Sequence, residues 1–264
     1  MNFDLSDDQK LIRQSARDFA TREIEPHAPA FDKEARWPTA IVEQMAELGF
    51  MGMAVPADLG GSGLDNVSYV LVMEEVSRAC ASCGVIMSVN NSLFCAPLLQ
   101  FGTPEQKREI LAPCAAGDKL GCFGLTEPAS GSDAQTMKTA AVRRGDGSYI
   151  LNGSKNFITC GPEADHVIVF AVTSEDRGKK RHTALIVKRD MAGYQIAPHD
   201  DKMGIRGAHS STIFFDNVKV PKEYVLGEDG QGFKIAMVTL DGGRIGIASQ
   251  ALGIARAALE KAIA

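Results

Sequence analysis

The sequence predicts an α+β fold in which helical segments lie on either side of a strand-rich middle part. Apolar residues recur at helical spacing until about residue 118. From about residue 119 the runs become β-branched or aromatic and are separated by turn residues. After Gly232 the helical spacing returns and lasts to the end of the sequence. These changes of period predict a helical part, a small antiparallel β domain and a second helical part.

Helix start and stop signals divide the first part into several helices. Ser6 and Gln9 form a capping box at the first start, and apolar residues at helical spacing follow until Pro26. Further helices are expected over residues 38–48, where Gly49 is the left-handed stop, over residues 66–78, and from the Thr103–Gln106 capping box toward Pro113.

The middle part contains the strand-like runs LGCFGL, YIL, HVIVFAV, TALIVK, STIFF and VKV. The turn sequences GDGS and Asn152-Gly153 are expected to separate strands. No βαβ alternation occurs, and no G-x-G-x-x-G motif opens a helix after a strand, so a dinucleotide-binding Rossmann domain is not expected. Gly60, Gly61 and Gly63 lack the following lysine of a phosphate-binding P-loop.

The last segment, FKIAMVTLDGGRIGIASQALGIARAALEKAIA, is rich in small residues that allow a helix to approach its neighbours closely. An apolar helix of this kind needs packing partners, and none follows it in the sequence. We therefore expect the sequence to be a fragment of a longer chain, or this helix to be covered by another chain. The small residues are Gly246, Ala248, Ser249, Ala251, Gly253 and Ala255.

Composition and charge limit the classes of function. The chain has 264 residues, of which 45% are hydrophobic and 23% charged, as in an ordinary globular protein. Its net charge of -5 and the lack of a Lys or Arg block argue against a nucleic acid or an anionic membrane surface as partner. No signal peptide is recognised, and no later segment is expected to reach the length of a transmembrane helix. The sequence predicts a location in the bacterial cytoplasm or in an organelle matrix.

Six cysteines are present, and only Cys80 and Cys83 form a C-x-x-C pair. A zinc site would need a second pair or histidines at ligand spacing, and a redox pair would need a βαβ setting. Neither occurs, so we expect buried, reduced thiols and no metal site. The five histidines show no mutual spacing that indicates a proton relay, and core or surface positions are expected for them.

Two segments carry residues suited to a flavin nucleotide. In GLTEPASGSD, the Thr126 hydroxyl can hydrogen-bond the edge of a planar heterocycle, and Gly131 with Ser132 lets backbone N–H groups approach a phosphate. In SKNFITCG, Phe157 offers an aromatic face, and Thr159 places a hydroxyl on the same side of a strand. Taken alone, each segment is explained more simply as a capped turn or an ordinary core strand.

Four motifs stand in one order along the chain: GLTEPASGSD, NGSKNFIT, KMGIRGAHSSTIFFDNVKVP and LGEDGQGFKIAMVTLDGGRIGIASQALGIA. With this order the sequence resembles the acyl-CoA dehydrogenases over essentially its whole length, and it is most similar to their short-chain, butyryl-CoA members. The resemblance implies a helical N-terminal domain over residues 1–118, an antiparallel β-barrel middle domain over 119–227, and the incomplete start of a C-terminal helical bundle over 228–264. It also implies FAD, held between the middle and C-terminal domains.

The resemblance assigns binding roles to motif residues. Ser132 would lie near the FAD pyrophosphate and the substrate thioester, and Asp241 and Arg244 would contact coenzyme A. A surface ion pair between Asp241 and Arg244 is the alternative for those two residues. Ala208 and His209 stand where relatives prefer serines, which affects the local loop contacts. The residues expected to bind FAD are Phe123, Leu125, Thr126, Gly131, Ser132, Phe157, Ile158 and Thr159.

The family reaction is the FAD-dependent α,β-dehydrogenation of an acyl-CoA thioester to the trans-2-enoyl-CoA, a step of fatty acid β-oxidation in lipid metabolism. It needs a carboxylate base for the α-proton. Family members carry this glutamate at one of two positions, of which one is Gly243 here and the other lies beyond residue 264. We therefore expect no catalytic residue within the chain, weak FAD binding and little activity of the chain alone. Glu127, which adjoins a flavin motif, is predicted to face solvent in its turn.

The resemblance also implies partners. These are a short-chain acyl-CoA substrate, an electron-transfer flavoprotein as electron acceptor, and a homotetramer when the chain has full length. A branched-chain or aromatic acyl-CoA substrate remains an alternative, because the acyl pocket cannot be sized from these residues. A non-catalytic flavin-binding or CoA-binding remnant of the same fold is the alternative from another class. An oxygenase-like or nitroalkane-oxidising relative is less favoured, because the short-chain motifs match more closely.

Overall fold

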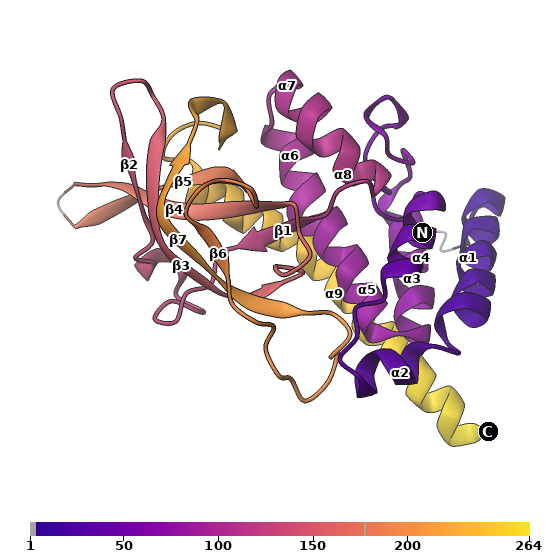
Figure 1. Cartoon of the computed structure of the whole chain (residues 1–264). Helices are drawn as coiled ribbons and strands as arrows, with labels where there is room; N and C mark the ends of the chain where they lie inside the picture. The colour runs from indigo at the N-terminus through magenta and orange to yellow at the C-terminus, as the bar shows by residue number, and fades with distance from the viewer. Residues whose placement is uncertain (1–3, 177) are drawn as a thin grey trace.

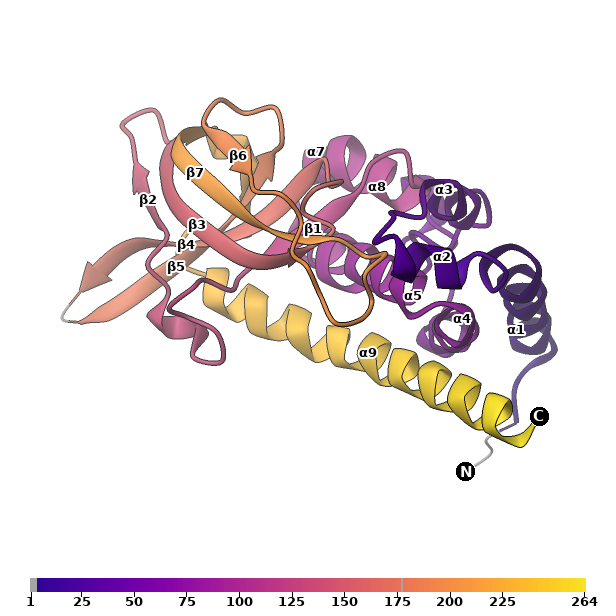
Figure 2. The ribbon, with the colours of Figure 1, turned by 60° about the horizontal axis from the view of Figure 1, so that its bottom comes forward.

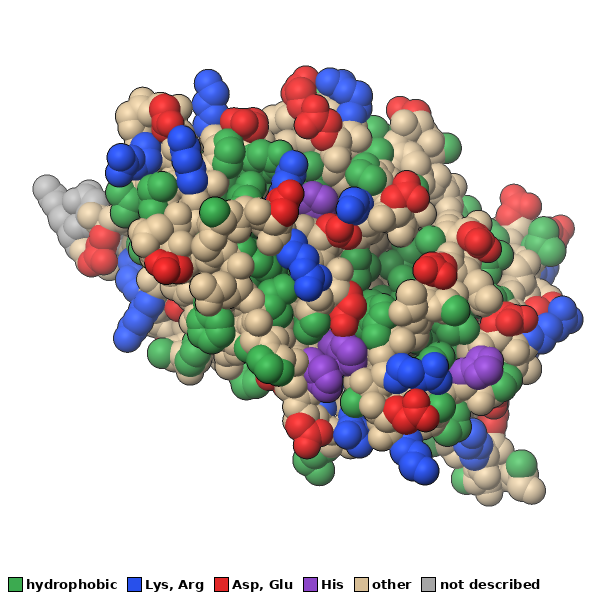
Figure 3. Space-filling view, viewed as in Figure 1, with side chains coloured by type: hydrophobic (Ala, Val, Ile, Leu, Met, Phe, Trp, Pro, Cys, Tyr) green, Lys and Arg blue, Asp and Glu red, His purple; other side chains and the backbone are tan. Residues whose placement is uncertain are grey.

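The structure, a computed structural model, describes residues 4–176 and 178–264. Helices gather on one side and a twisted sheet on the other, and the long helix α9 (Gly232–Ile263) packs against elements of both (Figures 1 and 2). The α+β class is therefore confirmed. On the face shown in Figure 3, Lys and Arg side chains are interspersed with Asp and Glu side chains rather than gathered in one basic area.

The first helical part follows the start and stop signals of the sequence. The capping box of Ser6 and Gln9 opens α1, the box of Thr103 and Gln106 opens α7, and Gly49 follows α3 with a φ of 72°. These predictions are confirmed. The helices are α1 (Asp7–Phe19), α2 (Ala28–Lys33), α3 (Thr39–Glu47), α4 (Asn66–Ala79), α5 (Ala81–Ser88), α6 (Ala96–Phe101), α7 (Pro104–Gln106) and α8 (Ala112–Ala116), with π-helical segments Ala20–Ile24, Val89–Cys95 and Lys107–Leu111.

One helical run is longer and more apolar than the sequence interpretation allowed. From Ala81 to Phe101, α5, the π-helical segment and α6 form 21 continuous helical residues, long and apolar enough to cross a membrane. The expectation that no segment reaches that length is therefore wrong. Because 78% of the most apolar stretch is buried inside the protein, the run is accounted for as a core helix. All six cysteines are buried and free, which confirms the expectation of reduced thiols.

The strands form one mixed sheet. Their order is β6-β7-β3-β2-β4-β5-β8, and β1 also pairs with β4. Most neighbours are antiparallel, but β1 and β2 both run parallel to β4. The expectation of a purely antiparallel domain is wrong in this respect. The strands are β1 (Gly121–Gly124), β2 (Ala140–Arg143), β3 (Tyr149–Thr159), β4 (His166–Asp176), β5 (Lys179–Lys188), β6 (Tyr194–Ile196), β7 (Ser210–Val220) and β8 (Val225–Leu226).

The two parallel pairings have one cause. β5 occupies one edge of β4, so β1 and β2 lie end to end along the other edge, where β1 pairs with residues 166–169 and Ala140 of β2 pairs with Val172. Between the two strands the chain leaves the sheet for residues 125–139 and then returns to the same edge in the same direction. This excursion contains residues 125–133 of the GLTEPASGSD motif, whose Gly124 ends β1, so most of the first flavin motif is a loop inserted between two halves of one edge.

The Asn152-Gly153 dipeptide lies inside a strand and does not form a turn. β3 continues through it, with a shift of register against β7 between Leu151 and Gly153. Gly153 has a φ of 139°, and a Cβ atom there would lie 2.6 Å from the Thr139 hydroxyl. The dipeptide therefore makes a β-bulge where the end of the excursion approaches the β3 backbone. The GDGS sequence does join β2 to β3, as predicted.

Small residues bring α9 close to α4, but only on one face. Gly246, Ser249 and Gly253 are buried, and a Cβ at Gly253 would lie 2.4 Å from the Glu74 carbonyl oxygen of α4. This part of the prediction is confirmed. Ala248, Ala251 and Ala255 are exposed instead, as are several large apolar residues of α9. These are Val238, Ile245, Ile247, Leu252, Ile254, Leu259 and Ile263.

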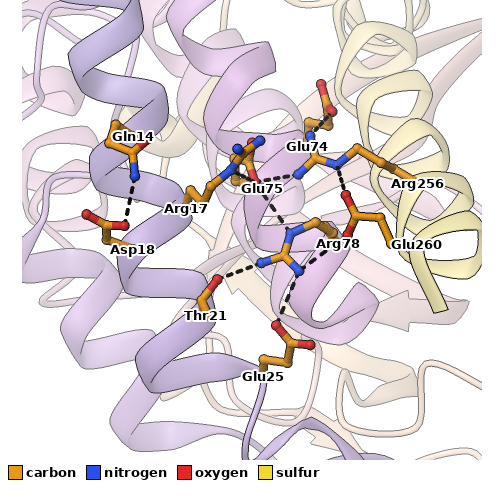
Figure 4. Close-up of polar contacts among 10 residues, drawn as sticks. All are labelled: Gln14, Arg17, Asp18, Thr21, Glu25, Glu74, Glu75, Arg78, Arg256 and Glu260. Atoms are coloured by element: carbon orange, nitrogen blue, oxygen red, sulfur yellow. Dashed lines mark hydrogen bonds and ion pairs between the residues drawn. The ribbon is translucent and has the colours of Figure 1, made fainter. Parts of the chain in front are cut away.

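A buried carboxylate joins three helices of the molecule (Figure 4). Glu75 of α4 has a side chain with 0% exposure and lies 2.8 Å from Arg17 of α1, 3.5 Å from Arg78, and 2.5 Å from Arg256 of α9. Hydrogen bonds from Arg17 and Arg256 outweigh the effect of burial, which alone would raise the pKa of Glu75, and hold that pKa below its ordinary value. The carboxylate therefore stabilises the packing of α1 and α9 on α4 while it is ionised.

The glycines of α9 give a matched pair of substitutions. Gly253→Ala should lower the free energy of unfolding by roughly 1–3 kcal/mol, because the added methyl group forces α9 away from α4. Gly242→Ala, at an exposed position with no heavy atom within 4 Å of the new Cβ, should raise stability by up to about 1 kcal/mol through helix propensity. Urea unfolding of both variants measures the difference, and equal effects would contradict the close packing.

The Glu75 network predicts a dependence of stability on pH. Replacing Glu75 by Gln should cost roughly 3 kcal/mol at pH 7, because three guanidinium groups lose their shared anion. A depressed pKa means that the carboxylate stabilises the fold above its ordinary value of 4.5 and that this contribution is lost as the pH falls through the folded value. Urea midpoints of the wild type and Glu75→Gln should therefore converge in acid. Parallel curves down to pH 3 would show that Glu75 is not the titrating group.

Candidate functional site

The turn that opens the excursion is closed by its own backbone. The N–H and carbonyl groups of Glu127 exchange hydrogen bonds of 2.9 and 3.0 Å with those of Ser130, and the Ser130 hydroxyl donates to the Asp133 carbonyl at 2.8 Å. Gly131 and Ser132, which follow this turn, are exposed, and the space around Gly131 is open to 4 Å. Within the described ranges their backbone N–H groups have no acceptor. Unpaired N–H groups of this kind can donate hydrogen bonds to an anionic oxygen of a ligand.

Phe157 is exposed at a second bulge of β3. The register against β7 shifts between Lys155 and Ile158, and Phe157 adopts a φ of 57°. A left-handed backbone at a bulky residue costs roughly 1–3 kcal/mol. The Phe157 side chain is nevertheless 67% exposed, so no packing within the chain accounts for this cost. An exposed aromatic face held by a strained backbone is a feature of ligand sites.

One hydrogen bond brings the two motifs together. The Asn156 N–H donates to the Thr126 carbonyl oxygen at 2.8 Å, which places the excursion beside the bulge that carries Phe157. The Thr126 and Thr159 side chains are partly exposed, and their hydroxyl groups have no hydrogen-bond partner in the part of the chain that the structure describes. Unpaired hydroxyls and an open aromatic ring fit a planar, polar heterocycle such as a flavin.

Other expected cofactor residues point inward. The Leu125 and Ile158 side chains are buried in the core, and the Phe123 ring packs against Phe170 with centroids 4.9 Å apart. Leu125 and Ile158 can therefore offer a ligand only their backbone groups. The alternation of β3 explains the difference, because the buried Ile158 lies between the exposed Phe157 and the partly exposed Thr159.

Glu127 is buried, so the prediction that it faces solvent is wrong. Its carboxylate lies 2.7 Å from the Lys155 ammonium, and the Lys155 side chain has 0% exposure. Burial lowers the pKa of Lys155 to about 8, against the attraction of Glu127. Burial alone would raise the pKa of Glu127, but Lys155 and hydrogen bonds from Lys138 and Thr139 hold that pKa below its ordinary value. Both groups are therefore charged at neutral pH.

The sequence interpretation missed Lys155, although a signal was present. Lys155 is a charged residue in the buried phase of a strand, directly beside the NFIT motif, where the alternation of β3 calls for an apolar side chain. A charge in such a position needs an opposite partner. Glu127, the acidic residue of the neighbouring motif, is the partner that could have been named.

A groove lies between α9 and the helical part. Its volume is about 510 Å³, and its lining is almost wholly apolar. Arg244 and Gly243 of α9 line it, whereas Asp241 and Ser132 do not. Asp241 and Arg244 are exposed and form the i, i+3 surface ion pair that was the alternative for them. The other lining residues are Ser88, Val89, Leu93, Leu240, Ile247, Ala248 and Ala251.

The loop with the departures from the resemblance is held by other contacts. Ala208 is buried, and its carbonyl oxygen accepts a hydrogen bond from Lys202. The His209 ring contacts the Glu163 carboxylate at 2.5 Å and the Ala35 carbonyl oxygen at 2.8 Å. His209 therefore ties the loop both to the segment between β3 and β4, through Glu163, and to the segment after α2, through Ala35. Among the described residues, no group of three or more His, Cys, Asp and Glu side chains could hold a metal ion.

The comparisons with known proteins show that the chain belongs to the acyl-CoA dehydrogenase family. Residues 6–118 match the family's N-terminal domain, residues 122–218 its middle domain, and residues 230–264 its C-terminal domain. Acyl-CoA dehydrogenases are FAD-dependent oxidoreductases.

Within the family, the chain is similar to short-chain enzymes. It is 50% identical over 260 residues to the mitochondrial short-chain specific acyl-CoA dehydrogenase of Bos taurus, a match that covers 98% of this chain and 63% of that relative. The structure of butyryl-CoA dehydrogenase from Megasphaera elsdenii matches with a TM-score of 0.96 and 43% identity, over 100% of this chain and 70% of that one. A structure described with the electron transferring flavoprotein of Acidaminococcus fermentans matches with a TM-score of 0.96 and 46% identity, over 100% and 69% of the two chains. The chain thus spans about 63% of the length of its bovine relative.

Proposed function

We propose that this chain supplies the flavin contacts and the acyl groove of an enzyme that dehydrogenates short-chain acyl-CoA thioesters to trans-2-enoyl-CoA. The observation that carries the proposal is Phe157, an exposed aromatic residue in a strained backbone beside a turn with unpaired N–H groups. A bound flavin supplies a hydride acceptor for such a reaction. The identity to short-chain relatives supports the choice of substrate class.

The proposed cofactor contacts are made by groups that have no partner within the described residues: an exposed ring, two hydroxyl groups and two backbone N–H groups. Phe157 would cover one face of the flavin ring, and the Thr126 and Thr159 hydroxyls would hydrogen-bond its polar edge. The N–H groups of Gly131 and Ser132 would bind the pyrophosphate. Phe123, Leu125 and Ile158 would contribute backbone groups. Ser132 would also lie near the substrate thioester.

The groove beside α9 suits the acyl chain. Val89, Leu93 and Ile247 give it an apolar lining that favours a hydrocarbon over water. Arg244 at the same groove can pair with a phosphate of coenzyme A, and Asp241 would orient Arg244 through their ion pair. A branched-chain acyl group is the alternative substrate, because a groove of about 510 Å³ also has room for a branch.

The chain lacks a base at this groove. None of its lining residues is acidic, and Gly243 occupies a position where some family members carry the catalytic glutamate. We propose that the 264-residue chain by itself has little or no turnover. The same observation favours, as a second candidate, a non-catalytic protein that binds flavin or CoA. In the full enzyme, electrons would pass to an electron-transfer flavoprotein, and the assembly would be a homotetramer in a bacterial cytoplasm or an organelle matrix.

Flavin binding tests the cofactor assignment directly. FAD added to the purified chain should lose fluorescence and gain resolved visible bands, and Phe157→Ala should weaken the affinity by about tenfold or more because base–aromatic contacts of this kind contribute 1–3 kcal/mol. Phe214→Ala removes another exposed phenylalanine of the same sheet and should leave the affinity unchanged. Equal losses in both variants would place the flavin elsewhere, and no binding by the wild type would reject the proposal.

A second experiment supplies the missing carboxylate. A Cβ at Gly243 meets only the end of the Leu93 side chain, at 2.9 Å, so a glutamate can enter the groove if Leu93 moves. With FAD, butyryl-CoA and an electron-accepting dye, Gly243→Glu should reduce the dye faster than the wild type by at least about a hundredfold, the usual scale of general base catalysis. Gly243→Gln has the same shape without a base and should stay inactive. Turnover by Gln equal to that by Glu would show that the groove does not hold the α-carbon.

A further inference from the structure

The geometry points to Lys155 and Glu127 as a positioning pair that holds the flavin-binding turn against the flavin-binding bulge. The inference rests on the proposed function, because it concerns the same two motifs. Neither residue is placed among the groups that would touch the cofactor. Their role is to fix the groups that would.

Lys155 reaches across the sheet to the start of the excursion. From β3 its ammonium donates to the Leu125 carbonyl oxygen at 3.1 Å and to the Glu127 carboxylate at 2.7 Å, and the Met137 sulfur lies 3.9 Å away. Leu125 directly precedes Thr126, and Lys155 stands two residues before Phe157. A single ammonium group therefore bridges the two segments that carry the exposed threonine and the exposed phenylalanine.

Glu127 extends the same connection to the far end of the excursion. Its carboxylate accepts hydrogen bonds from the Lys138 N–H at 2.6 Å and the Thr139 N–H at 3.0 Å. Thr139 directly precedes β2, and the Val172 N–H of β4 donates to its carbonyl oxygen at 2.8 Å. The pair thus closes residues 125–139 into a loop whose two ends are held by one carboxylate.

A purely structural explanation is weak for this pair. Burying an ammonium and a carboxylate is costly, and well-packed apolar residues of the same volume generally stabilise a core as well or better. What the charged pair provides is direction, because its bonds to the Leu125 carbonyl and to the Lys138 and Thr139 N–H groups end on defined backbone groups of the excursion. The groups of Thr126, Gly131 and Ser132 project from the segment that is fixed in this way. Binding a rigid ring and a pyrophosphate at once needs such preorganisation.

Substitutions of the pair should therefore lower the affinity for FAD by more than the change in the free energy of unfolding explains. Lys155→Met keeps most of the side-chain volume but frees the Leu125 carbonyl and leaves Glu127 without its counter-ion. FAD affinity should fall by about tenfold or more, and the visible bands of any bound flavin should shift because its hydrogen bonds change. Glu127→Gln keeps the shape of the side chain and should fall between the wild type and Lys155→Met.

The experiment measures FAD titrations and visible spectra together with urea unfolding of the FAD-free chain. The variants are Lys155→Met, Glu127→Gln and the double variant that carries both substitutions, each compared with the wild type. Gly253→Ala is the control, because it weakens the packing of α9 on α4 and leaves the turn unchanged. The double variant removes both charges, so it should recover stability relative to Lys155→Met but not flavin affinity or the band positions. If Lys155→Met does not fold, the Glu127→Gln and double variants carry the same comparison.

The outcomes separate this inference from the proposed function. No FAD binding by the wild type rejects both. Flavin binding by the wild type with unchanged affinity and spectra in the folded pair variants rejects only the positioning role. The positioning role is also rejected if Gly253→Ala, at an equal loss in the free energy of unfolding, lowers the affinity for FAD as much as the pair variants do.

Discussion

The constraint on which the site depends is the interruption of one sheet edge. β1 and β2 occupy successive stretches of the same edge of β4, and the chain leaves that edge only between them. An excursion that begins and ends on one edge needs its ends held together, because a loop of this length would otherwise retain much of its conformational entropy. The buried pair of Lys155 and Glu127 meets that need from the neighbouring strand β3. Among the described residues, the exposed groups of the excursion are consequently held beside the sheet without taking part in its hydrogen bonding.

The position of the helical part relative to the sheet depends on α9. α9 begins against β5 and then lies against α4, so one rigid element sets the position of the helices relative to the sheet. Its buried glycines allow backbone contact with α4, while Glu75 gathers arginines from α1, α4 and α9 around one carboxylate. Close contact excludes water from the interface, and the ion network fixes the register of the helices along each other. The groove that we assign to the acyl chain lies beside this interface, between α9 and the helical run that carries Ser88, Val89 and Leu93.

Local signals in the sequence predicted the local structure well. Capping boxes placed the helix starts, and the GDGS turn and the strand runs placed most of the sheet. The failures were non-local. Asn152-Gly153 reads as a turn because the dipeptide prefers left-handed backbone, but the approach of Thr139 uses the same preference for a bulge. Glu127 was predicted to face solvent because its buried partner, Lys155, lies 28 positions away in the sequence. Parallel pairing likewise depends on where the excursion returns, which no periodicity encodes. For the candidate site, the structure brings the two motif segments side by side, but whether a residue presents its side chain or only its backbone depends on the alternation and the bulges of β3.

The insertion of the excursion into an edge has a consequence for how this fold can vary. Because β1 and β2 are each paired with β4 on their own, the alignment of the strands does not depend on the length or sequence of residues between them. Substitutions and even length changes near Gly131 are therefore separated from the packing of the sheet, provided that the Glu127 carboxylate, which closes the excursion, stays. Changes in this loop can therefore alter which ligands the fold binds, while the strand order of the sheet stays the same.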